Sequence, residues 1–590
     1  MGEQEMGKLL VYLKDYKKES VLGPLFKLLE ASFELIVPLV MAAIIDHGVV
    51  DGDKPYIMKM CLVLVLLAVI GLTCSITAQY FAAKAAVGFS TGLRHALFEH
   101  IQKLSFSEMD TVGTSTLITR MTSDINQTQN GVNLVLRLFL RSPFIVFGAM
   151  IMAFTIDVKA ALVFVVTIPL LSVVVFGIML VSIPLYKKVQ SALDKVLGIT
   201  RENLTGSRVI RAFNKEDDEI TDFNNSNDAL TKIQLYVGKI SALMNPLTYV
   251  IINGAVVVLV RTGAIRVNSG YITQGEVVAL VNYMSQILVE LIKLANLIIN
   301  INKSIACGNR IQAIFELQPS ITDHAVTPVA EEKAEHSGEV PEVVFSHVGL
   351  TYAGAGEESL TDIDFTVKKG ETVGIIGGTG SGKSSVVNLI PRFYDATKGS
   401  VQIGGKDVRE YSLEELRGKI GMVLQKAVLF KGTIRENMLW GNENATDEDI
   451  MQALEVAQAK EFVDKKEGGL DFEIEQGGKN LSGGQRQRMT IARAVVKKPD
   501  ILILDDSASA LDFATDAKLR MAIRDMENKA TVFIVSQRAA SIMYADKIIV
   551  LDDGQIVGMG THEELLKQCE VYQEIYYSQF KKTEDEKEGR

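Results

Sequence analysis

The chain has 590 residues, 22% of them charged, and a formal net charge of −10. It carries neither a basic tail nor a dense stripe of lysine and arginine, which argues against nucleic acid as its main partner. Its mean hydropathy of +0.20 is high for that content of charge. The apolar residues must therefore be segregated, which predicts a membrane part joined to a soluble part and at least two domains.

The first twenty residues predict an amphipathic helix on the membrane surface rather than a cleaved leader. Leucines at positions 9, 10 and 13 are interspersed with lysines, and no apolar core followed by small residues marks a cleavage site. The four cysteines have neither the number of a disulfide scaffold nor the spacing of a metal site. We expect all of them to be reduced packing residues: Cys61, Cys74, Cys307 and Cys569.

Six apolar stretches are long enough to cross a bilayer as helices, which takes about 20 residues each. They lie at 22–45, 57–83, 134–156, 160–185, 244–266 and 277–301. The two long connections, 84–131 and 186–241, hold thirteen lysines and arginines, whereas the three short ones hold two. Positive charge marks the cytoplasmic side, so we expect a multi-pass protein of the inner membrane with both termini inside. Apolar residues at i, i+3, i+4 in the long connections predict membrane helices that continue into the cytoplasm, turn and return.

Several charged residues fall inside the predicted spans, where lipid alone would not tolerate them. Glu290 and Lys293 are three apart on the sixth span, which predicts either an internal salt bridge or a contact to a cationic substrate. Glu30 and Glu34 on the first span could do either. The spans also carry methionines and asparagines, which favour an adaptable lining but do not name a substrate.

The polarity of the sequence changes after the sixth span. We assign 1–325 to the membrane domain, 326–342 to a polar linker containing proline and glycine, and 581–590 to a charged tail. Between them, 343–580 alternates short β-branched runs with helical stretches. The predicted fold class is an α-helical membrane domain of six transmembrane helices with long cytoplasmic extensions, followed by an α/β P-loop ATPase domain.

A phosphate-binding loop follows a predicted strand at 372–376 and precedes a predicted helix at 386–393. It matches G-x-x-x-x-G-K-[ST] and comprises Gly377, Gly378, Thr379, Gly380, Ser381, Gly382, Lys383, Ser384 and Ser385. The glycines let backbone N–H groups close round the phosphates of ATP, while Lys383 adds a positive charge and Ser384 reaches Mg²⁺. The apolar strand 501–505 ends in Asp505, which can hold the shell of the same Mg²⁺.

A third motif lies between these two and consists of Leu481, Ser482, Gly483, Gly484 and Gln485. With it, the chain resembles a half-transporter of the ATP-binding cassette exporters over nearly its whole length. The resemblance implies that the cassettes of two chains pair head to tail, each closing ATP against the signature string of the other. Ser482 and the N–H groups of the two glycines would then bind the γ-phosphate in the partner's site.

The resemblance also implies roles for single positions. Tyr352 would stack on adenine, although a core tyrosine at a strand end is the alternative. Gln425 would touch Mg²⁺ and sense the membrane domain, unless it is simply a surface glutamine. The loop 509–512, ending in Asp512, would cross to the opposite site. The tips of the long connections, 107–114 and 212–217, would dock on the cassettes.

Two positions depart from the family pattern. Asp506 stands where the family has the glutamate that polarises the attacking water, and Gln537 stands where it has a histidine on the γ-phosphate. Both changes fall in one nucleotide site, a pattern that resembles the degenerate-site subunit of heterodimeric bacterial multidrug exporters. The implied partner is a homologous half-transporter with an intact site, and the implied cargo is a hydrophobic or amphiphilic small molecule. Two alternatives stay open: a homodimeric exporter of lipid, peptide or drug that uses Asp506 as a slow base, and an ATP-gated regulator or channel-like protein.

Overall fold

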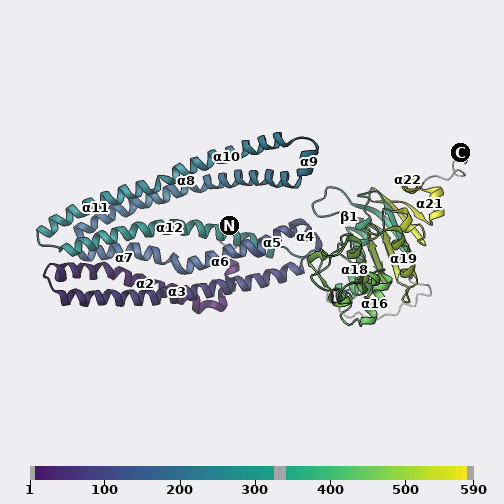
Figure 1. The fold of residues 1–590 in the computed structure, drawn as a ribbon, viewed down its shortest axis with the longest axis horizontal. Helices are drawn as coiled ribbons and strands as arrows, with labels where there is room; N and C mark the ends of the chain where they lie inside the picture. The colour runs from purple at the N-terminus through teal and green to yellow at the C-terminus, as the bar shows by residue number, and fades with distance from the viewer. Residues whose placement is uncertain (1–6, 324–340, 581–590) are drawn as a thin grey trace. The chain divides into compact units, whose positions relative to one another are not determined.

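The computed structural model describes residues 7–323 and 341–580, which form two compact units (Figure 1). Unit 1 comprises Met1–Gln102 and Thr114–Leu317, and unit 2 comprises Lys103–Gly113 and Gln318–Arg590. The predicted linker lies almost wholly outside the described residues, and the predicted charged tail lies entirely outside them.

Unit 1 contains six helical segments that are long and apolar enough to cross a membrane, which confirms the six predicted spans. They are Gly7–Val49, Lys54–Lys103, Thr114–Ile156, Val158–Thr205, Glu216–Asn268 and Gln274–Phe315. Each has between 42 and 53 residues, so at roughly 1.5 Å per residue each exceeds the hydrocarbon core of about 30 Å. The helices therefore continue beyond the membrane, as the periodicity of the long connections predicts.

Within these segments the regular helices run side by side (Figure 1). They are α2 (Lys17–Ala43), α3 (Lys54–Lys103), α5 (Thr114–Thr119), α6 (Ile125–Leu134), α7 (Arg141–Ile156), α8 (Val158–Thr205), α9 (Ser207–Ala212), α10 (Glu216–Ala242), α11 (Met244–Asn268) and α12 (Gln274–Phe315). Helices α2, α7 and α12 pack on one another, and α8 packs along α10 and α11. Fully buried alanines such as Ala31, Ala149 and Ala279 line the first group, because small side chains let apolar helices approach closely.

The N-terminal segment is helical from residue 7 and packs on α3. The ring of Tyr16 lies so close to Gly88 that a Cβ there would come within 2.1 Å of it, and Leu9 is buried. Residues 1–6 lie outside the described part, and the position of this segment on a membrane surface stays a prediction.

Unit 2 is built on three sheets. The strands are β1 (Val343–Leu350), β2 (Leu360–Val367), β3 (Thr372–Gly377), β4 (Lys398–Ile403), β5 (Lys406–Asp407), β6 (Ile420–Val423), β7 (Gly432–Thr433), β8 (Glu473–Ile474), β9 (Ile501–Asp505), β10 (Thr531–Val535), β11 (Lys547–Asp552) and β12 (Gln555–Gly560). The largest sheet has the order β12-β11-β3-β10-β9-β6 and is parallel except for β12; an antiparallel sheet has the order β2-β1-β4-β5, and β7 pairs with β8.

The helices of unit 2 are short. They are α4 (Phe106–Val112), α13 (Lys383–Leu389), α14 (Leu413–Lys419), α15 (Ile434–Leu439), α16 (Asp447–Val456), α17 (Lys460–Asp464), α18 (Gly483–Val495), α19 (Phe513–Arg524), α20 (Ala539–Ile542), α21 (His562–Gln568) and α22 (Glu570–Gln579). The central strands β9 and β10 are buried along their whole length, as expected of a parallel sheet covered on both faces. In register, Val535 at the end of β10 faces Asp505 on β9 and Ile375 on β3. The carboxyl ends of these three strands therefore meet at one edge, where a parallel sheet usually binds its ligand.

Helix α4 belongs to unit 2 although it lies between two membrane segments in the sequence. The ring of Phe106 is 4.6 Å from that of Phe393, and the hydroxyl of Tyr394 donates to Asp110 at 2.5 Å. The Ser105 hydroxyl accepts the Ile321 N–H at 3.0 Å. The first connection thus packs its tip on this chain's own α/β unit, as expected for 107–114.

Candidate functional site: a nucleotide pocket at the sheet edge

The phosphate-binding loop joins β3, which ends at Gly377, to α13, which begins at Lys383. Gly382 caps the helix in the left-handed region at φ 92°, so α13 begins at Lys383 and ends at Leu389. The prediction of a helix at 386–393 was therefore wrong at both ends. The helix starts early because Gly382 can adopt a backbone conformation that begins it directly at the lysine. At Gly377 an added Cβ would lie 2.1 Å from the Leu551 carbonyl oxygen, so the neighbouring strand admits only glycine there.

Lys383 is held inside the loop. Its ammonium donates to the carbonyl oxygens of Gly377, at 3.0 Å, and Gly378. Only 9% of the residue is exposed. Burial lowers the pKa of Lys383, and the nearby carboxylates of Asp506 and Asp505 oppose that shift. The ammonium also donates to the Ser381 hydroxyl at 3.3 Å, so the loop itself holds this positive charge in place.

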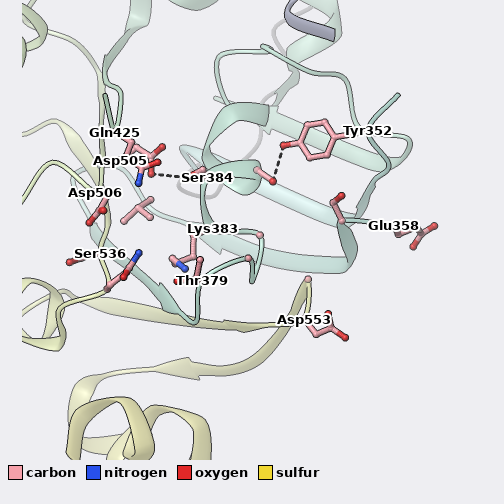
Figure 2. Close-up of a pocket in the computed structure, with 17 residues that line it drawn as sticks. Tyr352, Glu358, Thr379, Lys383, Ser384, Gln425, Asp505, Asp506, Ser536 and Asp553 are labelled. Carbon is pink, nitrogen blue, oxygen red and sulfur yellow. Dashed lines mark hydrogen bonds between the residues drawn. The ribbon is translucent and has the colours of Figure 1, made fainter. Parts of the chain in front are cut away.

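Ser384 and Asp505 form the polar floor of the pocket (Figure 2). The Ser384 hydroxyl donates to Asp505 Oδ1 at 3.0 Å. Burial raises the pKa of Asp505, while the hydrogen bond from Ser384 lowers it. Gln425 lines the same pocket. Hydroxyl, carboxylate and amide oxygens are hard donors of the kind Mg²⁺ prefers, so these three side chains fit a Mg²⁺ ion that also binds phosphate oxygens.

Asp506 has an unusual backbone. Its φ is 45°, a left-handed conformation that non-glycine residues seldom adopt, and its N–H donates to the Val535 carbonyl at 3.0 Å. Burial raises the pKa of the Asp506 carboxyl, whereas the Lys383 and Arg538 cations and a hydrogen bond from Gln425 lower it. The structure therefore places this carboxylate in the pocket, next to the phosphate-loop lysine.

Gln537 reaches the same pocket from the end of β10. Its side chain is exposed, but its backbone is fixed by the last helix. The Gln579 amide on α22 donates to the Gln537 carbonyl at 2.8 Å and accepts the Ala539 N–H at 2.9 Å. The Gln579 side chain thus bonds the backbone at residues 537 and 539 and fixes the loop that carries Gln537.

Tyr352 forms the opposite wall of the pocket. Its hydroxyl donates to the Ser385 hydroxyl at 2.8 Å, and its ring lies 5.0 Å from that of Tyr394 at 90°. Figure 2 shows this tyrosine on the far side of the loop from Asp505 and Asp506. The cavity between these walls measures about 420 Å³, within the usual range for a small-molecule site.

Several lining residues were missed in the sequence. They are Glu358, Ser359, Val535, Ser536, Asp553 and Gly554. Asp553 and Gly554 form the turn between β11 and β12, and an Asp-Gly pair does predict a tight hairpin. Its position beside the loop follows only from the strand order, which places β11 next to β3.

The signature string lies outside this pocket. Ser482 caps α18 in a reciprocal pair with Gln485: its hydroxyl accepts the Gln485 N–H at 3.3 Å, and its own N–H donates to Gln485 Oε1 at 3.0 Å. Asp512 caps α19 and accepts the Thr515 N–H at 2.9 Å. Gly483 has open space on its Cβ side, whereas a Cβ at Gly484 would lie 3.1 Å from the Ala510 carbonyl. Within the chain these residues do not meet the phosphate loop, and their role in a partner's site stays a prediction.

Both units match known families. The family model described as "ABC transporter transmembrane region" matches residues 20–291, and the model described as "ABC transporter" matches residues 360–509. An uncharacterized ABC transporter ATP-binding protein of Mycobacterium tuberculosis is 36% identical over 96% of this chain and 97% of its own length. YgaD of Bacillus subtilis, provisionally named a multidrug export ATP-binding/permease protein, is 32% identical over 97% of this chain and 98% of its own.

The solved structure of a bacterial Atm1-family ABC exporter with ATP bound has the same fold. It superimposes with a TM-score of 0.76 at 22% identity and covers 96% of this chain and 99% of that one. The predicted fold class, a six-helix membrane domain followed by an α/β ATPase domain, is confirmed.

Proposed function

The chain belongs to the ABC transporter family, as an exporter half-transporter whose ATPase domain drives transport, and we propose that it is the degenerate-site subunit of a heterodimeric exporter. In this proposal it binds MgATP in the pocket of β3, β9 and β10 and hydrolyses it slowly there. Its signature string completes the competent site of a homologous partner. The cargo is an amphiphilic small molecule or drug, moved across the inner membrane with the ATPase domain in the cytoplasm.

One observation supports the proposal: the pocket contains the groups that would bind MgATP, whereas Asp506 and Gln537 stand at the two positions where the family pattern has a glutamate and a histidine. Lys383, Ser384 and Asp505 remain, but Asp506 carries a side chain one methylene shorter than glutamate. That draws the carboxylate back by roughly 1 Å or more, and catalytic positioning tolerates little of that. Gln537 can donate a hydrogen bond but cannot become a cation, so it supports the γ-phosphate less well in the transition state.

The chain's own groups account for binding without fast turnover. The Lys383 ammonium can exchange its contacts with loop carbonyls for contacts with phosphate oxygens. Ser384 and Asp505 are already aligned by their hydrogen bond and would hold Mg²⁺, which neutralises phosphate charge when it is bound. The raised pKa of Asp506 would make it a better proton acceptor, but its short reach keeps it from the attacking water.

The choice of cargo class is supported by two things. YgaD is named for multidrug export, and the spans of this chain bury several charged side chains, which suit an amphiphile better than a wholly apolar lipid tail.

Restoring both positions should raise turnover. If Asp506 and Gln537 are what disable this site, the double variant Asp506→Glu/Gln537→His should increase the ATPase rate of the purified complex by about two- to five-fold, because the groups that bind nucleotide are already in place. We expect a modest gain, since the partner's signature string also limits this site. Steady-state phosphate release measures it.

Each single variant serves as the control for the double. Asp506→Glu alone should give part of the gain, and Gln537→His alone less, because the cation helps only when water is activated. An unchanged rate in the double variant, with the partner's signature string intact in its sequence, would contradict this account of the defect.

The second connection should couple the two units. Phe213, in the predicted tip 212–217, is 72% exposed, and an exposed aromatic ring at a turn suits a docking contact. Phe213→Asp should leave nucleotide binding intact and remove at least about four-fifths of any substrate-stimulated ATPase activity, since only a packed contact transmits closure.

Leu204→Asp is the matched control for that variant. Leu204 is 74% exposed near the end of α8 but lies outside the predicted tip, so the same charge there should leave stimulation unchanged. Normal stimulation and transport in Phe213→Asp would rule out this tip as a coupling element.

A further inference from the structure

A second pocket lies in unit 2, between α19, α20 and the strands β3 and β10. It measures about 380 Å³, within the usual range for a small-molecule site. Its lining includes Thr372 and Val532, which face each other near the starts of β3 and β10. The nucleotide pocket lies at the carboxyl ends of the same strands, and the two pockets have none of their described lining residues in common. The second pocket is therefore a separate site.

The floor of this pocket is apolar. Ile523 from α19 and Val532 and Ile534 from β10 are almost fully buried and close its inner end. Met521 and Tyr544 lie at its rim and are 59% and 75% exposed. Apolar side chains exposed around a hollow are typical of a ligand groove, and methionine adapts its shape to what it contacts. A ligand that fits this pocket must bring an apolar body.

The charge at the mouth of the pocket is positive. Arg520 and Arg524 are the only charged residues among the described ones that line it. Arg520 Nε lies 3.3 Å from Asp516 Oδ2 and donates to the Asp516 carbonyl at 3.4 Å. Its two terminal nitrogens have no hydrogen-bond partner among the described residues, and no described residue forms a hydrogen bond or ion pair with the Arg524 side chain. Both guanidinium groups thus have N–H donors left for a ligand.

The acidic side chains nearby do not cancel this charge. Asp516 is buried and pairs with Arg520, so it offsets that arginine alone. Asp525 and Asp546 are not part of the lining, and Asp546 Oδ2 already accepts a backbone N–H at 2.8 Å. The lining therefore keeps a net positive charge, that of Arg524.

The remaining polar groups of the lining also suit an anion. The Ser541 hydroxyl is already used, because it donates to Asp516 at 3.0 Å. The hydroxyls of Thr372 and Tyr544 can each donate to a ligand oxygen. A guanidinium binds a carboxylate through two parallel N–H bonds, and one uncompensated arginine matches one negative charge. The ligand that fits is a carboxylate with a single charge and an apolar chain.

We propose that this pocket binds fatty-acid anions, with the carboxylate held by Arg520 and Arg524 and the alkyl chain on the apolar floor. The Met521 side chain closes over the chain. Helix α19 begins directly after Asp512, and β10 ends two residues before Gln537, so a bound fatty acid contacts the elements that carry both positions. The inference goes beyond the proposed export function and does not depend on it.

Equilibrium binding of radiolabelled decanoate tests the proposal. The purified full-length transporter is placed in phosphatidylcholine nanodiscs without nucleotide, and empty nanodiscs give the background of partition into lipid. Wild type should bind decanoate saturably. Arg524→Gln should weaken binding about ten-fold, because it removes the charge from a charge-assisted hydrogen bond. The exposed Arg524 side chain has no partner among the described residues, so its replacement should leave the fold intact, and MgATP binding at wild-type affinity verifies this.

Lys518→Gln is the matched control. Lys518 is exposed on the same helix but lies outside the lining, so the same loss of charge there should leave affinity unchanged. On wild type, hexanoate should bind at least about ten-fold more weakly than decanoate, because four fewer methylene groups reach the floor. Neutral decanol should not respond to Arg524→Gln. Absence of saturable decanoate binding, an unchanged affinity in Arg524→Gln, or equal affinities for hexanoate and decanoate would each overturn the proposal.

Discussion

Gly483→Val should nearly abolish ATP hydrolysis by the purified complex, whereas Lys383→Ala should reduce it much less. In the head-to-tail arrangement, the signature string of this chain serves the partner's competent site, and Lys383 serves its own degenerate one. A bulky side chain at Gly483 would block the approach of backbone N–H groups to the γ-phosphate where the chemistry occurs. Loss of such transition-state donors typically costs about 10²–10³ in rate. Steady-state ATPase rates of the two variants, measured in the same assay, distinguish the heterodimer from the homodimer.

The structure favours position 483 over 484 for this test. An added Cβ at Gly483 meets no heavy atom within 4 Å, but one at Gly484 would press on the Ala510 carbonyl at 3.1 Å. A loss caused by Gly483→Val therefore arises from the nucleotide or the partner rather than from misfolding of α18. In a homodimer each substitution would affect both sites. Equal and near-total losses from the two variants would overturn the heterodimer and favour the homodimeric alternative.

The sequence predicted the elements of the fold because each has a strong local signal. Runs of apolar residues marked the six spans, and the glycine-rich motif after a β-branched run marked the phosphate loop. The start of α13 was misplaced because a positive φ at Gly382 decides whether the lysine is in coil or helix, and periodicity does not report φ.

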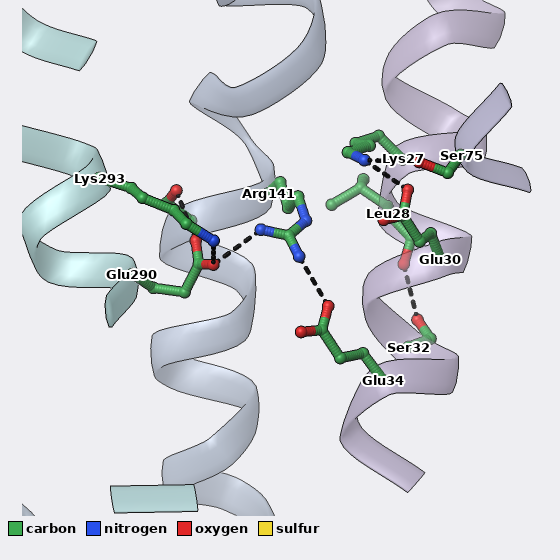
Figure 3. Close-up of polar contacts among 10 residues, drawn as sticks. Lys27, Leu28, Glu30, Ser32, Glu34, Ser75, Arg141, Glu290 and Lys293 are labelled. Atoms are coloured by element: carbon green, nitrogen blue, oxygen red, sulfur yellow. Dashed lines mark hydrogen bonds and ion pairs between the residues drawn. The ribbon is translucent and has the colours of Figure 1, made fainter. Parts of the chain in front are cut away.

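The side chains that come together at each site were harder to predict from the sequence. Lys383, Ser384 and Asp505 lie in motifs, but Ser536 and Asp553 reach the pocket only because β10 and β11 flank β3. The hydrogen bond from Gln579 to the Gln537 carbonyl joins residues that are 42 positions apart, and no local sequence pattern predicts it. In the membrane unit the i, i+3 pair of Glu290 and Lys293 was foreseeable. The contacts of Arg141 with Glu290 and Glu34 (Figure 3) were not foreseeable, because they depend on how α2, α7 and α12 are rotated against one another.

We expect a large loss of stability when Glu290, which accepts a hydrogen bond from Arg141 at 2.7 Å, is removed. Arg141 and Glu290 are 8% and 3% exposed, and the Arg141 Nε already has no hydrogen-bond partner among the described residues. Glu290→Ala would leave a second nitrogen of a buried guanidinium unpaired. Removing one member of a buried ion pair costs about 3–5 kcal/mol. The unfolding free energy of the purified complex in mixed micelles, titrated with denaturing detergent, measures this loss.

The double variant Arg141→Met/Glu290→Leu distinguishes two quantities. One is the destabilisation caused by an unpaired buried charge, and the other is the net contribution of the ion pair to the unfolding free energy. Buried ion pairs can often be replaced by apolar residues of similar volume at little cost, so the double variant should recover most of the stability lost in Glu290→Ala. It would also leave Glu34 without its arginine, and a small residual loss is expected from that exposed carboxylate. If Glu290→Ala unfolds within about 1 kcal/mol of wild type, Arg141 finds other partners or water at this depth. The charged side chains around Arg141 would then rearrange, and Arg141 would not hold Glu34 in one position.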